Sequence, residues 1–338
     1  MTRADKPLAL TLGDPAGIGP DITLLAFEER FRTPIPPFVL LGDPDVLAER
    51  ARALGLGVKI KTMGDPSAAP PVFAIALPVL PISVATSVVA GDPDAANAAI
   101  VQQSIERSVA LVRSGAASAV VTNPISKAIL ARASFSFPGH TEFLAALAGR
   151  EASDAVMMLV GEGLRVVPVT IHIPLKDVMG ALSTERILKT LEITARDVAR
   201  YFGLARPRIA VTGLNPHAGE DGTMGREEIE TIMPAIEAAR RQGLDVTGPY
   251  SADTLFHAEA RKTYDVAVAM YHDQALIPVK TLAFDTGVNV TLGLPFVRTS
   301  PDHGTAFPLA GTGRASPRSL IEALRLADTM QRNADAAP

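Results

Sequence analysis

Three of the six histidines stand just past the ends of short apolar segments that are rich in Val and Ile. These segments and their histidines are Val166–Ile171 with His172, Ile209–Leu214 with His217, and Val266–Tyr271 with His272. Each segment lacks the 3.6-residue spacing of an amphipathic helix and is predicted to be a buried strand. Ligands of open parallel sheets bind beyond the carboxyl ends of the strands, so the three imidazoles are expected at one edge. Three histidines with an open fourth position are typical of a catalytic divalent-metal site.

A histidine that only ends a loop is the simpler interpretation of any one of these positions. The same placement after three separate strands favours a shared role in metal binding. Asp273, which follows His272, and Asp253 are expected either to join the metal shell or to orient a histidine. His257 falls within Ser251–Arg261, which is predicted to be a helix, and is interpreted as structural.

A glycine-rich loop follows the first predicted strand and offers a place for an anion. It reads Gly13-Asp-Pro-Ala-Gly17-Ile-Gly19-Pro20 and opens a helix near Asp21. Glycines let the backbone approach a ligand closely, and a helix N-terminus favours negative charge. A plain turn between strand and helix explains the loop equally well. The GxGxxG, Walker A, HExxH and GxSxG patterns are absent from the sequence.

Two further polar positions stand at expected helix starts. Lys127 closes the segment Asn123–Lys127 after the predicted strand Ala117–Val121. Its ammonium can hold a phosphate or carboxylate, or act as a base if it is desolvated, whereas a solvated lysine is the structural alternative. His140 and Thr141 offer an imidazole and a hydroxyl, and a helix cap by Thr141 is the structural alternative.

The segment Asn289–Ser300 combines an amide, hydroxyls and a guanidinium around a strand interrupted by Gly and Pro. Arg298 and Lys280 are two cations at separate positions in the sequence, and together they could hold a phosphate between them.

Length and composition bound the class of protein. A chain of 338 residues with a 47% hydrophobic share has room for about two domains with sizeable cores. The absence of cysteine excludes disulfides, thiolate zinc sites and a cysteine nucleophile. A net charge of −4, with no basic stripe and no Trp, argues against nucleic acid as a partner. No membrane-spanning stretch or signal peptide is recognised, so a cytoplasmic protein is expected.

Strand-like and helix-like segments alternate, which predicts an α/β fold with a largely parallel sheet. The predicted strands are Pro7–Leu12, Phe38–Leu41 and Ala117–Val121, besides those before the three histidines. The predicted helices are Asp21–Arg30, Pro44–Leu54, Ala95–Ser114, Ser183–Tyr201 and Gly225–Gln242. Pro234 is expected to kink or split the last of these helices. Gly161-Glu-Gly163 predicts a tight turn between antiparallel strands Val156–Val160 and Leu164–Thr170.

Long motifs along the whole chain resemble those of the 4-hydroxythreonine-4-phosphate dehydrogenases of vitamin B6 biosynthesis. They are GDPAGIGPD (Gly13–Asp21), PGHTEF (Pro138–Phe143), GLNPHAGEDGTMGREE (Gly213–Glu228), ADTLF (Ala252–Phe256), MYHDQALIPVK (Met270–Lys280) and GVNVTLGLPFVRTSPDHGTAF (Gly287–Phe307). The resemblance implies two α/β/α domains with a cleft between them, as in isocitrate and isopropylmalate dehydrogenases. Residues 1–125 with 279–338 are expected to form the cofactor-side domain. Residues 126–278 are expected to form the dimerisation and metal or substrate domain.

The resemblance also implies functional residues. The implied metal ligands are His172, His217 and His272, in a site that both subunits of a homodimer build. The implied substrate contacts are His140, Thr141, Lys280, Asn289 and Arg298. The implied cofactor residues are His303, Gly304, Thr305, Gly311 and Gly313, in a loop that replaces the missing GxGxxG pattern. The general base is not identified, and Lys127, Asp253 and Asp273 are its candidates.

The implied activity is metal-dependent, NAD- or NADP-dependent oxidation of 4-phosphooxy-L-threonine to 2-amino-3-oxo-4-phosphooxybutanoate, which decarboxylates to 3-amino-2-oxopropyl phosphate. An acidic residue is usual in the family where Pro308 stands, so the choice between NAD and NADP is left open. A histidine site suits Zn²⁺ or Co²⁺, and the family also works with Mg²⁺. The alternatives are a sister dehydrogenase for 4-phosphothreonate or a cis-dihydrodiol carboxylate, a metal-dependent hydrolase or lyase, and a non-catalytic binding protein.

Overall fold

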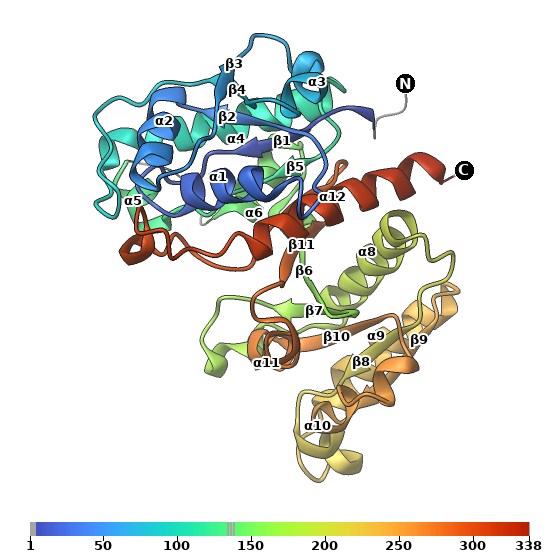
Figure 1. Cartoon of the computed structure of the whole chain (residues 1–338). Helices are drawn as coiled ribbons and strands as arrows, with labels where there is room; N and C mark the ends of the chain where they lie inside the picture. The colour runs from blue at the N-terminus through green and yellow to red at the C-terminus, as the bar shows by residue number, and fades with distance from the viewer. Residues whose placement is uncertain (1–4, 134, 136, 138, 338) are drawn as a thin grey trace. The chain divides into compact units, whose positions relative to one another are not determined.

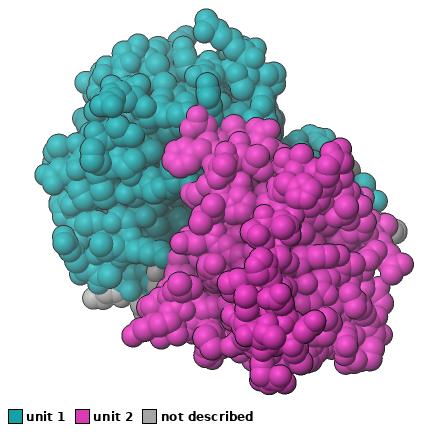
Figure 2. Space-filling model, turned by 90° about the horizontal axis from the view of Figure 1, so that it is seen from below, with its two compact units in different colours: residues 1–155, 294–336, 338 teal, residues 156–293, 337 magenta. Residues whose placement is uncertain are grey.

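The computed structural model describes residues 5–133, 135, 137 and 139–337, so Pro138 of the PGHTEF motif lies outside the described residues. Figure 2 shows that the chain divides into two compact units. Unit 1 contains the chain up to Ala155 and Leu294–Ala336, and unit 2 contains Val156–Gly293.

The chain passes from unit 1 to unit 2 between residues 155 and 156 and returns between residues 293 and 294. The sequence prediction placed these two crossings at 125/126 and 278/279. Two packing relations account for the difference. The helix α6 (His140–Leu147) contacts α4 (Ala98–Arg113) and therefore stays with unit 1. The strand β11 (Val288–Leu292) pairs with β6 (Val156–Gly161) and therefore stays with unit 2.

Unit 1 is built on a parallel sheet with the strand order β3-β4-β2-β1-β5-β12. Its strands are β1 (Leu8–Thr11), β2 (Phe38–Gly42), β3 (Ile60–Thr62), β4 (Leu77–Pro81), β5 (Val120–Val121) and β12 (Arg298–Pro301). Every residue of the central strands β1 and β2 is buried, as expected of a parallel sheet covered on both faces. The predicted strands in this unit are confirmed: β1 and β5 are shorter than predicted, and β2 is one residue longer.

Helices cover the sheet of unit 1 (Figure 1). Besides α4 and α6 they are α1 (Gly19–Glu29), α2 (Pro44–Ala53), α3 (Ala69–Phe73), α5 (Lys127–Arg132) and α12 (Arg318–Ala336). The apolar side chains on one face of α4 are buried, and the helix packs against β1 and β2; these side chains are Val101, Ile105, Val109 and Val112. The helix α2 begins after Asp43, whose carboxylate accepts hydrogen bonds from the backbone N–H groups of Asp45 and Val46.

Unit 2 is built on a mixed sheet with the strand order β11-β6-β7-β10-β8-β9. The strands not yet given are β7 (Leu164–Thr170), β8 (Ile209–Thr212), β9 (Val246–Tyr250) and β10 (Val266–Tyr271). β6 is antiparallel to β7 and β11, while β7, β10, β8 and β9 run parallel. The predicted turn between β6 and β7 is confirmed, with positive φ at Glu162 and Gly163 (47° and 76°), as type I′ turns require.

The helices of unit 2 are α7 (Val178–Ala181), α8 (Thr184–Phe202), α9 (Met233–Arg241), α10 (Ala252–Leu255) and α11 (His272–Ala283). The split expected at Pro234 is confirmed, because a π-helical turn at Glu228–Ile232 precedes α9. The helix predicted over Ser251–Arg261 is wrong, since α10 ends at Leu255. Only Leu255 of that segment is buried, so it has no apolar stripe that packing could stabilise.

The observed architecture confirms the predicted α/β class in both units. Within the described part of the chain, no helix combines the length and apolar character needed to span a membrane.

Candidate active site

The three strands that precede the candidate metal ligands are neighbours in the sheet of unit 2. Their order is β7-β10-β8 and all three run parallel, so their carboxyl ends share one edge. His172 follows the end of β7, His272 begins α11 directly after β10, and His217 lies in the loop after β8. The strand positions expected from the sequence are therefore observed.

Two of these histidines are brought together. The ring centroids of His172 and His272 are 5.6 Å apart, a separation at which two imidazoles can share one ion. Nδ1 of His272 lies 2.7 Å from Oδ1 of Asp273, and donation by Nδ1 leaves the lone pair on Nε2 for a metal. Both rings line a cavity of ≈ 260 Å³ together with Leu175, Val178 and other side chains of the same unit.

His217 lies near Asp253 and affects the pKa of that carboxylate. The pKa of Asp253 is lowered, mainly by the hydroxyl of Ser251 and to a small extent by His217. Among residues 5–133, 135, 137 and 139–337, no three His, Asp or Glu side chains are arranged to hold a metal ion. Among these residues, His172 and His272 are the two predicted ligands that are paired, and the three-histidine metal site stays a prediction.

The backbone at two of the three histidines is strained. His172 and His217 have φ values of 51° and 52°, in the left-handed region that disfavours residues with a Cβ. Such conformations cost about 1–3 kcal/mol each and persist where the surrounding structure imposes them. His217 shares this conformation with its loop neighbours Ala218, Glu220 and Asp221.

Gln274 connects the two strand ends that lead to His272 and His217. Its Oε1 accepts hydrogen bonds from the backbone N–H of Met270 and from Oγ1 of Thr212, both at 2.8 Å. Its Nε2 donates to the carbonyl of Gly213 at 2.8 Å. The hydroxyl of Thr170, at the end of β7, donates to the carbonyl of Met270 at 2.8 Å. These side chains hold the ends of β7, β10 and β8 in register, and the sequence analysis did not identify them.

The loop that carries His217 is held by a buried carboxylate. Glu228 is 4% exposed and accepts hydrogen bonds from the backbone N–H groups of Leu214 and Asn215, both at 2.8 Å. It also accepts one from Nδ2 of Asn215 at 3.0 Å. A Cβ at Gly219 would lie only 2.5 Å from Oε2 of Glu228, so a glycine is required there. The sequence placed Glu228 in a helix first turn, and only the structure reveals that it binds the loop.

Unit 1 brings an imidazole close to two cations: His140 begins α6, Lys127 begins α5 and Arg298 begins β12. Nε2 of His140 is buried and has no hydrogen-bond partner among the described residues. Burial first, and then the charges of Arg298 and Lys127, hold the pKa of His140 well below its ordinary value. Arg298 is 3% exposed, and burial lowers its pKa to about 10. A neutral imidazole beside two cations suits an anionic ligand.

The contacts of this cluster are specific. Nη2 of Arg298 donates to the hydroxyl of Thr122 at 2.6 Å. Lys127 packs against Gly139, where a Cβ would lie 3.1 Å from Nζ. α6 has no side-chain cap, so the capping alternative for Thr141 is not observed.

The other predicted substrate residues belong to unit 2. Lys280 lies in α11, and Asn289 lies in β11 opposite Leu159 of β6. The strand predicted over Asn289–Ser300 is interrupted by Gly and Pro as expected, and its two parts, β11 and β12, belong to different units. The turn at Gly293, with a φ of 86°, ends the first of them.

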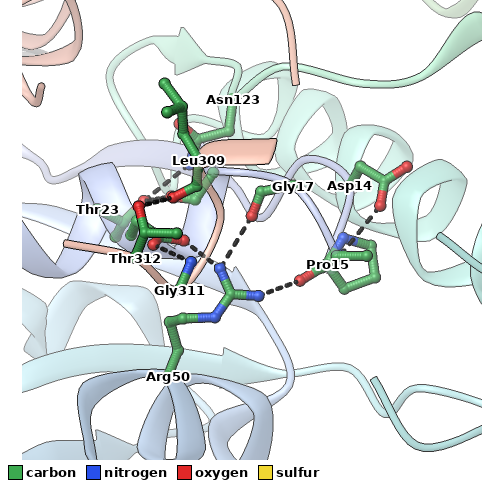
Figure 3. Close-up of polar contacts among 12 residues, drawn as sticks. Asp14, Pro15, Gly17, Thr23, Arg50, Asn123, Leu309, Gly311 and Thr312 are labelled. Carbon is green, nitrogen blue, oxygen red and sulfur yellow. Dashed lines mark hydrogen bonds and ion pairs between the residues drawn. The ribbon is translucent and has the colours of Figure 1, made fainter. Parts of the chain in front are cut away.

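The predicted cofactor loop packs against the glycine-rich loop Gly13–Pro20 of the same unit. Figure 3 shows the polar contacts around them. The carbonyl of Thr305 accepts from the backbone N–H of Ile18 at 3.0 Å, and the N–H of Gly311 donates to Asp21 at 2.7 Å. A Cβ added at Gly304 meets no atom within 4 Å, so that backbone is open to a ligand. Hydrogen bonds to the glycine-rich loop and to Asp21 therefore fix the cofactor loop, while the space beside Gly304 is open, an arrangement that fits a bound dinucleotide.

Comparisons with known proteins agree with this arrangement. The 4-hydroxythreonine-4-phosphate dehydrogenase of Methylorubrum populi is 58% identical over 335 residues, which cover 98% of this chain and 96% of the relative. The crystal structure of the Klebsiella pneumoniae enzyme of the same name has a TM-score of 0.87 at 38% identity and covers 96% of this chain and 99% of that one.

A second solved structure is similar at a lower level. The terephthalate 1,2-cis-dihydrodiol dehydrogenase of Burkholderia xenovorans has a TM-score of 0.66 at 30% identity, covering 96% of this chain and 98% of its own. The model of the family "Pyridoxal phosphate biosynthetic protein PdxA" matches residues 34–327. The chain therefore belongs to the PdxA family.

Proposed function

We propose that this chain oxidises the secondary alcohol of 4-phosphooxy-L-threonine with NAD or NADP, in the synthesis of pyridoxine 5′-phosphate. The observation that carries the proposal is 58% identity, over nearly the full length of both chains, to a relative named for this activity. The product is 2-amino-3-oxo-4-phosphooxybutanoate, a β-keto acid that loses CO₂ to give 3-amino-2-oxopropyl phosphate.

The proposal names five substrate residues. In unit 1, Arg298 and His140 with its neighbour Thr141 provide cationic, neutral imidazole and hydroxyl groups for the anionic substrate. In unit 2, Lys280 and Asn289 provide an ammonium and an amide. The alcohol carbon gives its hydride to the nicotinamide, so these residues act by placing that carbon accurately.

The hydroxyl proton must leave to a base, for which three residues remain candidates. Asp273 contacts His272, Asp253 lies near His217, and Lys127 lies near His140. The pKa of Asp253 is lowered, first by the hydroxyl of Ser251, so this carboxylate is ionised at neutral pH. Lys127 must lose a proton before it can accept one.

The histidines of the proposal are His172, His217 and His272, which would hold one divalent cation: Zn²⁺, Co²⁺ or Mg²⁺. Such a cation polarises the substrate hydroxyl and favours its ionisation. The pairing of His172 with His272 fits two ligands of this set. His272 is oriented for this role by Asp273.

We propose further that a second copy of the chain completes the metal site in a homodimer. The described residues of one chain hold no three-ligand group, although two ligands are paired. Large apolar side chains are exposed on the segments that carry those two ligands, namely Leu175, Met179, Ile277 and Phe284. Exposed apolar side chains of this size commonly mark a protein interface. Sedimentation analysis should give a dimer, and a monomer that binds the metal with full affinity would contradict the proposal.

NAD and NADP are both compatible with the cofactor loop. Pro308 carries no charge and no N–H, so it neither binds a ribose hydroxyl nor repels a 2′-phosphate. The loop residues His303, Gly304 and Thr305, with Gly311 and Gly313, are proposed to contact the dinucleotide.

The substrate is tested by comparing kcat/KM for 4-phosphooxy-L-threonine, 4-phosphothreonate and a cis-dihydrodiol carboxylate with either dinucleotide. The proposal expects the first substrate to be used best. Preferential turnover of another would move the chain to a sister reaction on the same scaffold, and hydrolysis without a dinucleotide would overturn the dehydrogenase assignment.

A further inference from the structure

A buried ion pair joins the first two helices of unit 1. Asp21, in the first turn of α1, is 0% exposed, and Arg50, near the end of α2, is 5% exposed. Nη1 of Arg50 donates to Oδ2 of Asp21. Removing both charges from water carries a cost that the pair offsets only when its remaining donors and acceptors are also satisfied. The contacts of those remaining atoms therefore indicate the structural role of the ion pair.

The guanidinium of Arg50 binds two carbonyl groups of the glycine-rich loop. Nη1 donates to the carbonyl of Gly17 at 3.0 Å, and Nη2 donates to the carbonyl of Pro15 at 3.1 Å. The planar fork of an arginine binds two carbonyls in a fixed orientation, which a lysine cannot reproduce. Figure 3 shows Arg50 pointing its guanidinium between these two groups.

The other carboxylate oxygen of Asp21 holds the cofactor loop. Oδ1 accepts a hydrogen bond from the backbone N–H of Gly311 at 2.7 Å. Gly311 has a φ of 73°, so its N–H direction depends on a conformation that favours glycine. One ion pair thus binds both loops, the glycine-rich one through Arg50 and the cofactor one through Asp21.

A second set of contacts fixes the cofactor loop near its start. The backbone N–H of Ile18 donates to the carbonyl of Thr305 at 3.0 Å. A Cβ at Gly17 would lie 3.1 Å from that carbonyl, so the two loops are in close contact. The segment between Thr305 and Gly311 is therefore held at one end by the glycine-rich loop that Arg50 supports and at the other end by Asp21, the partner of Arg50.

We infer that Asp21 and Arg50 are positioning residues for dinucleotide binding: the pair holds the loop Thr305–Gly311 in the conformation that the cofactor meets. The inference rests on the proposed function, because that function makes this loop the cofactor loop. Holding a loop in its bound conformation in advance removes an ordering cost from binding. Loss of the pair should then weaken dinucleotide binding more than it weakens the rest of the enzyme.

The test compares the double variant D21N/R50M with the wild-type enzyme. The double variant removes both charges, so it leaves no buried charge unpaired, and it deletes the contacts of the guanidinium to Pro15 and Gly17. Asp43→Asn is the matched control, since Asp43 is a buried carboxylate of the same unit that caps α2 and contacts neither loop in the described hydrogen bonds. Arg50→Lys keeps the charge without the fork.

Three quantities are measured for each variant: the Kd for NAD⁺ and NADP⁺ by calorimetry, amide hydrogen exchange over residues 303–313, and the Kd for Zn²⁺. D21N/R50M should bind dinucleotide roughly tenfold or more weakly and exchange faster over 303–313, with an unchanged Kd for Zn²⁺. Arg50→Lys should show a smaller shift in the same direction, and Asp43→Asn should show none.

Unchanged dinucleotide affinity and unchanged exchange in D21N/R50M would overturn the inference. Failure of the dehydrogenase assignment gives a different result: the wild-type enzyme would then bind neither dinucleotide, whatever the exchange at 303–313 shows. A sister dehydrogenase would still bind a dinucleotide and would leave the inference open to the same test. A variant that fails to fold is recognised by fast exchange throughout unit 1. In that case Arg50→Lys decides, and wild-type dinucleotide affinity in it would overturn the role of the fork.

Discussion

His172 and His272 come from different strand ends, and their rings meet with centroids 5.6 Å apart at one edge of the sheet in unit 2. The parallel order of β7 and β10 produces this pairing, because it places the residues after both strands at the same edge. The hydroxyl of Thr170 and the carbonyl of Met270 join the two strands just before the histidines.

Replacement of either paired histidine should remove most of the metal affinity. In His172→Ala or His272→Ala, one imidazole ligand is lost, and the Kd for Zn²⁺ should rise by more than about 100-fold, beyond what the loss of a supporting residue causes. Competition with a chromophoric chelator measures it. His257→Ala is the control, since His257 lies outside the strand-end group. Equal Zn²⁺ affinity in all three variants would exclude these histidines as ligands.

Gln274 should contribute to both stability and metal binding. Gln274→Leu leaves the carbonyl of Gly213 and the N–H of Met270 without their partner, which should lower the free energy of unfolding by about 1–3 kcal/mol. Urea denaturation measures the loss, and the Kd for Zn²⁺ should rise as the strand ends separate. Gln102→Leu is the control, because Gln102 is exposed and donates only to Glu106. A Gln274 variant no less stable than this control would contradict the role in strand register.

Glu228 should matter more than its neighbour Glu227. Glu228→Gln exchanges an acceptor-only carboxylate for an amide whose NH₂ group faces other donors, so the unfolding free energy should fall by about 1.5–3 kcal/mol. In Glu227→Gln the amide oxygen can still accept the hydrogen bond from Asn215, so the unfolding free energy should fall by less. Thermal and urea unfolding of the two variants provide the comparison. Equal losses would mean that burial of Glu228 does not organise the loop.

The depressed pKa of His140 predicts a pH dependence of stability. In the unfolded chain this imidazole takes a proton below about pH 6.5, whereas in the folded chain burial, Arg298 and Lys127 keep it neutral to much lower pH. The unfolded state thus binds more protons, so stability falls as the pH drops below that value. His140→Gln should flatten this part of the profile between pH 5 and pH 7, measured by urea denaturation; an unchanged slope would show that His140 titrates normally.

The sequence predicted the parts of the fold that depend on local pattern. The buried strand β10 is a continuous apolar run and β7 is mostly apolar, and the turn at Glu162 and Gly163 is specified by two adjacent residues. Pro234 marked the split before α9 because it cannot donate a hydrogen bond within a helix. Such features require no knowledge of distant contacts.

The remaining features depend on contacts that no local pattern contains. Asp21 reads as a favourable first-turn acid in α1, yet its partners are Arg50 and Gly311, which the chain brings to it from elsewhere. Gln274 reads as an ordinary helix residue, and its role follows only from the order β10-β8. The loop that carries His217 after β8 is likewise held by Glu228 through contacts that the local sequence does not reveal.

The most direct test of the central claim is NADH or NADPH formation by the purified enzyme on 4-phosphooxy-L-threonine, before and after chelation, with Zn²⁺, Co²⁺ or Mg²⁺ added back. The account predicts turnover that a chelator abolishes and a divalent cation restores in the wild-type enzyme but not in His272→Ala. Turnover that persists in the chelated enzyme, or that His272→Ala retains in full, would contradict a metal-dependent dehydrogenase built on these histidines.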